Sequence, residues 1–383
     1  MKVAIPRERR AGELRVAASP ETVKKLKALD LDVVVESGAG TGASIPDQSF
    51  ADAGATIAPD AASALADADI VLKVQRPITA AEGGPDELAL MKKGAMLFAI
   101  LQPHNARESV QAYATAGVNA FAMEFMPRIT RAQVMDVLSS QANLAGYKAV
   151  VDAASEYGRS FPMMMTAAGT VPPARAFIMG VGVAGLQAIA TAKRLGAIVS
   201  ATDVRPAVKE QVQSLGGSFV AVENEEFKQA ETAGGYAKEM SDDYKRQQAA
   251  LVAEHIKKQD IVITTALIPG RKAPILVTAE QVATMKPGSV IIDLAVEQGG
   301  NVEGSRPGEI VVTDNGVKII GHTNYPSRMA EASSLLYAKN LLALLTTLHD
   351  KEAKAIAVNW DDEIVKAIAL TRDGQVVHPA FAG

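Results

Sequence analysis

The sequence contains no cysteine among its 383 residues, only five histidines, and few aromatic residues, which make up 4% of the chain. The absence of cysteine excludes disulfides, thiolate nucleophiles and sulfur-ligated metals. The histidines, at positions 104, 255, 322, 349 and 378, form no short-spaced pair, so we predict no histidine-based metal site. The net charge is −4 and no basic stripe is present, which argues against nucleic acid as a partner.

The chain also lacks a long uncharged apolar stretch. The most apolar window, residues 335–348, contains Lys339 and is shorter than the roughly 18 residues that a membrane span needs. The first residues enter a strand-like run without the apolar core of a signal peptide. Apolar residues still make up 48% of the chain, which suffices for a large core, and the length suggests two or three domains. We therefore expect a cytoplasmic protein.

The most informative stretch that is present covers residues 174–203. A short apolar run is followed by three glycines at the spacing GxGxxG, then by a segment of helical periodicity and a second apolar run. The second run ends in Asp203. This order of strand, turn, helix, strand and acid is typical of a dinucleotide-binding unit. The three glycines are Gly180, Gly182 and Gly185.

Each part of this unit has a physical task. Gly180 permits the tight turn, Gly182 lets a pyrophosphate approach the backbone, and Gly185 lets the helix pack against the strand. The helix N-terminus offers unpaired N–H groups and a positive dipole end to the phosphates. Asp203 would accept hydrogen bonds from a ribose diol and repel a 2′-phosphate, which favours NAD(H) over NADP(H). Arg205 weakens this preference, because an arginine near this position can hold a 2′-phosphate.

A second glycine-rich segment, residues 38–42, follows an earlier strand candidate. No long amphipathic helix begins directly behind it, since Pro46 and Asp47 intervene, and no acid-ended strand follows at the required distance. We predict a flexible loop there rather than a second dinucleotide site.

Strand and helix candidates alternate along most of the chain, which predicts parallel sheets covered on both faces. Two longer helix candidates, residues 139–157 and 333–348, separate these regions. We predict an α/β chain of two doubly wound, Rossmann-like domains joined by two long helices, with a cleft between them. The first domain comprises residues 1–138 and 328–383, and the NAD(H)-binding domain comprises residues 139–327.

Two segments depart from this pattern. Residues 223–244 have paired glycines and weak periodicity, which predicts a long loop of functional importance. Three consecutive methionines, Met163 to Met165, are interpreted as adaptable core filling.

Several motifs resemble the alanine dehydrogenase and nicotinamide nucleotide transhydrogenase superfamily. They are KVAIPRER at residues 2–9, RVA at 15–17, KVQRP at 73–77 and TAAGTVPPAR at 166–175. Three more motifs look similar to the NAD(H)-binding alpha subunit, or domain I, of proton-translocating transhydrogenases. They are MEFMPRITR at residues 123–131, DVLSSQANLAG at 136–146 and AGGYAKEM at 233–240. The resemblance runs nearly end to end.

The two branches of this superfamily make different chemical demands. An alanine dehydrogenase needs a cationic anchor and a proton donor for its keto acid, and Arg15 and Lys73 lie where that family has its anchors. The family's histidine is replaced by Gln102, which cannot exchange a proton near neutral pH. His104 lies two residues later and is expected to be oriented differently. We therefore interpret Arg15 and Lys73 as structural ion-pair residues.

The resemblance to transhydrogenases implies direct hydride transfer from NADH on this chain to NADP⁺ on another polypeptide. Arg128 is then expected near the carboxamide or phosphates and Gln133 at the hydride-transfer face, with Asp136 as the third residue assigned to catalysis. Tyr236 and Met240 resemble part of a mobile loop that closes over the nucleotide. The remaining cofactor residues implied by the resemblance are Ile129, Thr130, Arg131, Ser139, Val183, Val204, Arg205, Gly235, Ala266 and Leu267.

The same resemblance implies a homodimer, an NADP(H)-binding partner subunit, and membrane-spanning subunits that attach the chain to the inner face of the cell membrane. Two alternatives stay open: an amino-acid dehydrogenase of the alanine type, and a non-catalytic NAD-sensing protein. Residues 128–139 also have an ordinary explanation, as polar residues at the start of a helix.

Overall fold

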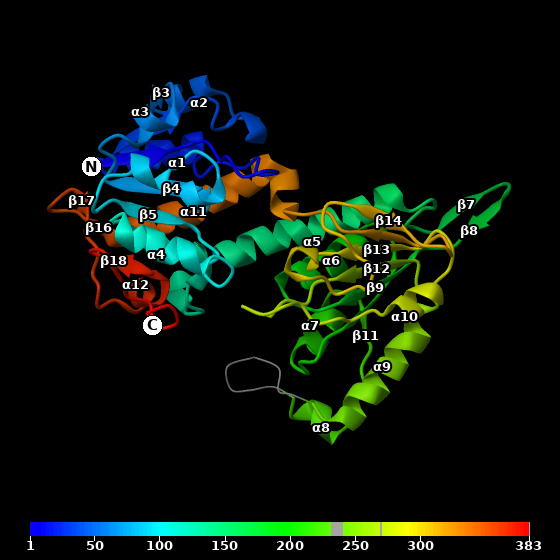
Figure 1. The fold of residues 1–383 in the computed structure, drawn as a ribbon. Helices are drawn as coiled ribbons and strands as arrows, with labels where there is room; N and C mark the ends of the chain where they lie inside the picture. The colour runs from blue at the N-terminus through cyan, green and yellow to red at the C-terminus, as the bar shows by residue number, and fades with distance from the viewer. Residues whose placement is uncertain (231–239, 269, 383) are drawn as a thin grey trace. The chain divides into compact units, whose positions relative to one another are not determined.

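The computed structural model describes residues 1–230, 240–268 and 270–382. The chain divides into two compact units (Figure 1). Unit 1 comprises residues 1–141 and 326–383, and unit 2 comprises residues 142–325. Each unit is built on its own open, mostly parallel sheet, so the predicted α/β class with two doubly wound, Rossmann-like domains is confirmed.

The sheet of unit 1 has six parallel strands in the order β3-β2-β1-β4-β5-β6. The order reverses between β1 and β4, and ligands of such sheets bind beyond the carboxyl ends of the strands at this switch point. Val3 and Ile5 pack into one apolar core and Ala4 into another, as alternation requires in a strand buried on both faces. The strands are β1 Lys2–Ile5, β2 Asp32–Glu36, β3 Thr56–Ala58, β4 Ile70–Gln75, β5 Met96–Ile100 and β6 Asn119–Ala122.

Helices of unit 1 begin where the sequence supplies caps. Ser19 caps α1 by accepting the Thr22 N–H at 3.2 Å, and Pro20 occupies the first helical position, where a missing N–H costs little. The α-helices are α1 Pro20–Lys27, α2 Asp47–Asp52, α3 Ala61–Leu65, α4 Arg107–Thr115, α11 Ala330–Leu348 and α12 Glu363–Ile368. The 3-10 helices are η1 Thr41–Ala43, η2 Ala80–Glu82, η3 Leu88–Leu90, η4 Met123–Phe125 and η5 Thr130–Met135, with η7 Tyr325–Met329 at the return to unit 1. The C-terminal part adds β16 His349–Asp350 paired with β17 Ala355–Ile356, and β18 Thr371–Arg372 paired with β19 Gln375–Val376.

The sheet of unit 2 has the strand order β11-β10-β9-β12-β13-β15-β14, in which β14 alone of the seven is antiparallel. Its switch point lies between β9 and β12. Ala176 and Ile178 face one core while Phe177 and Met179 face the other. The strands are β9 Arg175–Met179, β10 Ile198–Thr202, β11 Ser218–Phe219, β12 Ile261–Thr264, β13 Val290–Asp293, β14 Ile310–Val312 and β15 Lys318–Ile320. The helices of unit 2 are α6 Val183–Arg194, α7 Val208–Ser214, α8 Glu225–Lys228, α9 Asp242–Ile256, α10 Ala279–Ala283 and η6 Val296–Gln298.

The two predicted long helices are α5, Val137–Glu156, and α11. α5 begins in unit 1 and ends in unit 2, and α11 starts soon after the chain re-enters unit 1. Among the helices that the structure describes, none combines the length and apolar character that crossing a membrane takes.

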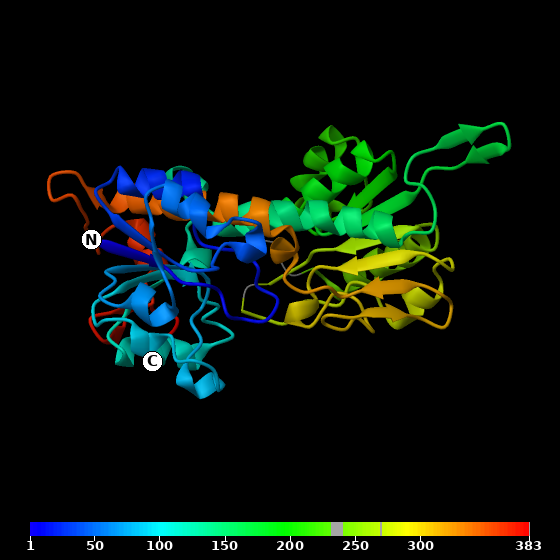
Figure 2. The same cartoon turned by 90° about the horizontal axis from the view of Figure 1, so that it is seen from above.

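Two expectations from the sequence were wrong. Residues 223–230 and 240–244 are not a plain loop, because Asn224 caps α8 and Ser241 caps α9. The methionines do not fill a core: Met163 is 58% exposed and Met165 is 79% exposed. Met164 and Met165 lie on a two-stranded hairpin, β7 Met164–Thr166 and β8 Gly169–Val171, which projects from the rest of unit 2 in both views (Figure 2).

Candidate functional site

The glycine-rich turn after β9 has the geometry of a phosphate cradle. Gly180 has φ +99°, and a Cβ on it would lie 2.5 Å from Thr265 Oγ1. A Cβ on Gly185 would lie 2.0 Å from the carbonyl oxygen of Gly180, so α6 packs directly on the turn. Gly182 differs, because nothing lies within 4 Å of the position its Cβ would take. The turn is therefore tight where it contacts protein and open at one point.

That open point coincides with the N-terminus of α6. Gly182 is the N-cap residue and supplies no side-chain cap, so the N–H groups of the first helical turn are available to an anion. The first turn is also held from outside. A Cβ on Gly146 of α5 would lie 2.1 Å from the Ala184 carbonyl oxygen, and Asn143 donates to Gln187 Oε1 at 3.1 Å.

The second glycine-rich segment has no such space. A Cβ on Gly40 would lie 2.4 Å from the Ile45 carbonyl oxygen, and one on Gly42 would lie 2.6 Å from that of Leu14. The segment leads into η1, which is only three residues long. It is a packed turn rather than the flexible loop we predicted, and it does not place a helix N-terminus beside open space.

Asp203 lies at the end of β10, where the sequence predicts the ribose-binding acid. Its carboxylate accepts the Val181 N–H at 2.7 Å and an ion pair from Arg205 at 2.9 Å. The acid is thus tied both to the glycine-rich turn and to the arginine that weakens the preference for NAD(H). Val183 and Val204, two further predicted cofactor residues, are 39% and 47% exposed. They offer apolar surface on either side of this acid and the turn.

Ala266 and Leu267 follow β12, which lies on the opposite side of β9 from β10. Thr265 donates its hydroxyl to the Gly180 carbonyl at 3.0 Å, so this segment abuts the glycine-rich turn. Leu267 is 49% exposed. Together with Asp203, these residues flank the switch point of unit 2 from both sides.

The predicted catalytic residues lie in unit 1, on η5 and at the start of α5. Asp136 accepts the Ser139 N–H at 2.9 Å and the Ser139 hydroxyl at 2.5 Å. These two residues therefore cap α5, as the ordinary explanation for them requires. Gln133 is exposed, and its side chain makes no hydrogen bond to any residue that the structure describes. Arg128 and Thr130 are exposed, and Ile129 packs against the core of unit 1.

Arg131 is engaged with α12. Its guanidinium donates to both carboxylate oxygens of Asp362 at 2.9 Å and to Glu363 at 3.2 Å. A role for Arg131 in binding a nucleotide would require these bonds to be exchanged.

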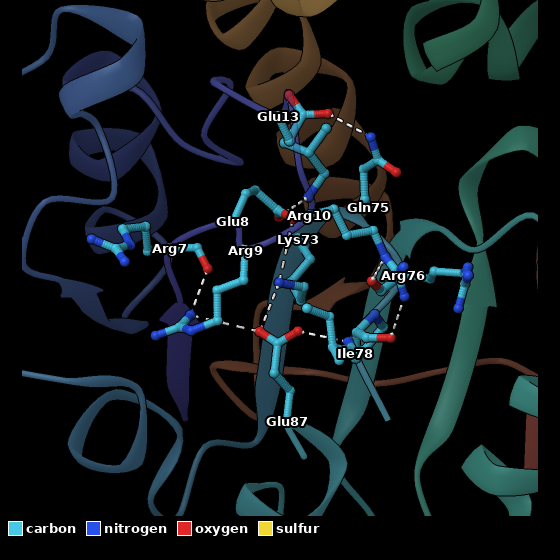
Figure 3. Close-up of polar contacts among 12 residues, drawn as sticks. Arg7, Glu8, Arg9, Arg10, Glu13, Lys73, Gln75, Arg76, Ile78 and Glu87 are labelled. Carbon is cyan, nitrogen blue, oxygen red and sulfur yellow. Dashed lines mark hydrogen bonds and ion pairs between the residues drawn. The ribbon is translucent and has the colours of Figure 1, made fainter. Parts of the chain in front are cut away.

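A buried charge network occupies the switch point of unit 1 (Figure 3). Lys73 is 1% exposed, and its Nζ lies 3.0 Å from Glu87 and 3.4 Å from Glu8. Burial opposes the charged form, but the carboxylates of Glu8 and Glu87 hold the pKa of Lys73 above its ordinary value. Arg15 is 4% exposed and donates to both oxygens of Glu13 at 2.7 and 2.6 Å, and to Gln141 at 2.8 Å. Both cations are therefore neutralised inside the protein.

Comparison with known proteins agrees with this arrangement. The family described as "Alanine dehydrogenase/PNT, N-terminal domain" matches residues 4–145, and "Alanine dehydrogenase/PNT, C-terminal domain" matches residues 149–379. The chain belongs to the alanine dehydrogenase/PNT family. The predicted membership is confirmed.

Within the alanine dehydrogenase/PNT family, the similarity to the transhydrogenase branch is greater. The chain is 61% identical to an NAD(P) transhydrogenase subunit alpha chain of Rhodospirillum rubrum over 383 residues, which cover 100% of this chain and 99% of that protein. It is 33% identical to alanine dehydrogenase of Mycobacterium tuberculosis over 310 residues, which cover 80% of this chain and 76% of that protein. The solved structure of a transhydrogenase from Sinorhizobium meliloti matches with a TM-score of 0.88 and 57% identity, covering 98% of this chain and 100% of that one.

The position that separates the two branches of the family lies at the end of β5. Gln102 has φ +49°, and its N–H donates to Glu124 Oε1 at 2.5 Å. His104 does not face this point, because its ring packs against Phe125 at 5.5 Å and Phe381 at 5.2 Å between ring centroids. Removal of its carboxyl from water raises the pKa of Glu124 to about 7.

Sequence reasoning missed two residues near these sites. Glu124 directly follows the predicted strand beside β5, and an acid at the carboxyl end of a parallel strand is the signal that could have found it. Asn301, which contacts Ala266, follows two glycines with no motif to single it out. Of the predicted loop residues, Gly235 and Tyr236 lie outside the described residues. Met240 packs in a small apolar cluster with Phe227, Ala230 and Tyr244.

Proposed function

We propose that this chain is the NAD(H)-binding subunit of a proton-translocating transhydrogenase. Bound NADH supplies a hydride that passes directly to NADP⁺ on a partner subunit, and separate membrane-spanning subunits couple this transfer to proton movement. The residues of this chain bind, orient and exclude water rather than exchange protons. Residues 139–327 form the NAD(H)-binding domain, and residues 1–138 with 328–383 form the second domain.

The fit to a dinucleotide is supported by the space at Gly182 beside the uncapped N-terminus of α6, with Asp203 at the end of the next strand. We assign the pyrophosphate to this helix end and the adenosine ribose to Asp203. Arg128, Gln133 and Asp136 are assigned to the nicotinamide end, with Gln133 at the transfer face. The exposed, unbonded side chain of Gln133 is compatible with that assignment.

The observation that favours this function over an amino-acid dehydrogenase is the buried network at Arg15 and Lys73. A keto acid needs a cation with free hydrogen-bonding capacity, whereas these two already bind Glu13, Gln141, Glu8 and Glu87. Opening the network would leave carboxylates buried without partners, which is costly. Gln102 also supplies no proton.

The decisive experiment is reconstitution with an NADP(H)-binding subunit. We expect hydride transfer from NADH to an NADP⁺ analogue only when that subunit is present. Oxidation of NADH that depends on pyruvate and ammonia would instead establish the dehydrogenase. Binding of NADH with neither activity would establish an NAD-sensing protein.

We further propose a homodimer that works at the inner face of the cell membrane, held there by partner subunits. The hairpin of β7 and β8 supports the dimer, because a two-stranded hairpin with exposed methionines is only marginally stable alone. Replacing Met163 and Met165 with serine should shift the mass in analytical ultracentrifugation toward the monomer. An unchanged dimer would exclude the hairpin as its contact, and a monomeric unmodified protein would exclude the dimer.

A further inference from the structure

Asn301 fastens the segment that follows β12. Its side chain is fully buried, with 0% exposure. Oδ1 accepts the Ala266 N–H at 3.0 Å, and Nδ2 donates to the Ala266 carbonyl at 2.9 Å and to the Pro274 carbonyl at 2.8 Å. One side-chain amide thus satisfies both backbone groups of Ala266, as a neighbouring strand would.

Only a carboxamide of this length can make these three bonds. An aspartate would turn its second oxygen toward two carbonyl oxygens, and a leucine would leave three backbone groups unpaired in a buried place. The identity of residue 301 therefore decides whether Ala266 is held.

Asn301 is itself fixed from the next strand. Its N–H donates to the two carboxylate oxygens of Asp293, at 3.2 and 3.0 Å, and Asp293 is fully buried at the end of β13. Its carbonyl accepts the Leu276 and Val277 N–H groups at 2.7 and 3.0 Å. The amide that holds Ala266 is therefore rigid.

The fastened segment borders the glycine-rich turn through the bond between Thr265 and Gly180. It lies across β9 from Asp203. In a doubly wound sheet the two halves of a dinucleotide bind on the two sides of the switch point. Ala266 and Leu267 thus border the half that Asp203 does not.

We propose that Asn301 is a positioning residue of the NAD(H) site, which sets Ala266 and Leu267 against the nicotinamide half of the dinucleotide without touching the nucleotide itself. This inference rests on the proposed function, because it requires NADH to bind at unit 2. It assigns to Asn301 an effect on one half of the ligand only.

The test compares Asn301→Leu and Asn301→Asp with a matched control, Asn315→Leu. Asn315 donates to the carbonyls of Val282, Ala283 and Met285, but it precedes β15 and so belongs to the opposite edge of the sheet. Thermal unfolding and the binding of NADH and of AMP are measured for each protein. We expect both leucine variants to unfold at lower temperature. The two Asn301 variants should bind NADH at least about tenfold more weakly and AMP unchanged, whereas Asn315→Leu should bind both normally.

NADH affinity that is unchanged in the Asn301 variants would overturn the proposal. An equal loss of NADH and AMP binding would also overturn it, since that indicates general disruption of unit 2. Asn301→Asp, which keeps the bond to the Ala266 N–H, serves if Asn301→Leu does not fold. If the unmodified chain binds no NADH, the proposed function fails before this inference is reached.

Discussion

Arg205 donates its Nε and Nη2 to the two carboxylate oxygens of Asp203, each at 2.9 Å. The backbone N–H of Arg205 reaches Asp203 as well, at 2.9 Å. A ribose diol at Asp203 must therefore compete for oxygens that an arginine already occupies. The carboxylate still repels a 2′-phosphate, but the adjacent guanidinium partly cancels that repulsion.

The first prediction concerns this pair. Asp203→Ala should erode the preference for NADH over NADPH, because it removes the acceptor for the ribose diol. Arg205→Ala should strengthen the preference by about three- to tenfold, because the carboxylate is then free to bind the diol and to repel a phosphate. Equilibrium titration of both nucleotides against each variant measures the effect. Equal affinity of the unmodified protein for NADH and NADPH would contradict the assignment of NAD(H) to this site.

The second prediction concerns the network at Lys73. Lys73→Met leaves Glu8 and Glu87 buried without their shared cation, so the free energy of unfolding should fall by about 3–5 kcal/mol. The control is Lys25→Met, which breaks an exposed pair with Glu21 and should cost at most about 0.5 kcal/mol. Urea unfolding measures both. A Lys73→Met protein as stable as the control would show that the network can relax, and would reopen the site to a carboxylate ligand.

The third prediction concerns pH and Glu124. Its pKa rises from the ordinary 4.5 to about 7 on folding, so the folded state favours the neutral acid. The stability that this group contributes is complete below pH 4.5 and is lost as the pH rises through 7. Glu124→Gln cannot ionise, so its stability relative to the unmodified protein should rise by about 2–3 kcal/mol between pH 4.5 and 8.

Glu82 provides the opposite sign in the same unit. Desolvation opposes the shift, but the hydrogen bonds from Arg10 and Thr79 and the charge of Arg76 lower the pKa of Glu82 to about 2. Its contribution is present above pH 4.5 and is lost only as the pH falls through 2. Between pH 4.5 and 8 the unfolding curves of Glu82→Gln should therefore run parallel to those of the unmodified protein. Parallel curves for Glu124→Gln as well would refute the raised pKa.

The sequence predicted those parts of the molecule that depend on neighbours along the chain. The GxGxxG turn, α6 and the acid after β10 are specified within about thirty residues, as such units generally are. Contacts between distant residues escaped. Arg131 pairs with Asp362, and nothing near Arg131 in the sequence marks it as an ion-pair partner rather than a phosphate ligand. Met165 was misjudged because burial depends on what packs above a residue, and a methionine has the same composition in a core and on an exposed hairpin.

The last prediction concerns Gln133, the residue that we place at the transfer face. Its side chain is exposed on η5 and bonds to no described residue, so Gln133→Asn should leave the fold intact. If Gln133 sets the geometry between two nicotinamides, a shorter side chain should slow hydride transfer by about ten- to a hundredfold, or about 1.4–2.8 kcal/mol in barrier, while NADH binding changes less. The matched control is Gln111→Asn, exposed on α4 of the same unit, which should leave the rate unchanged. Equal loss of binding and rate in Gln133→Asn would contradict the positioning role. Tritium from solvent at the transferred position of the NADPH product would contradict direct transfer itself, because a hydride that passes straight between two nicotinamides never exchanges with water.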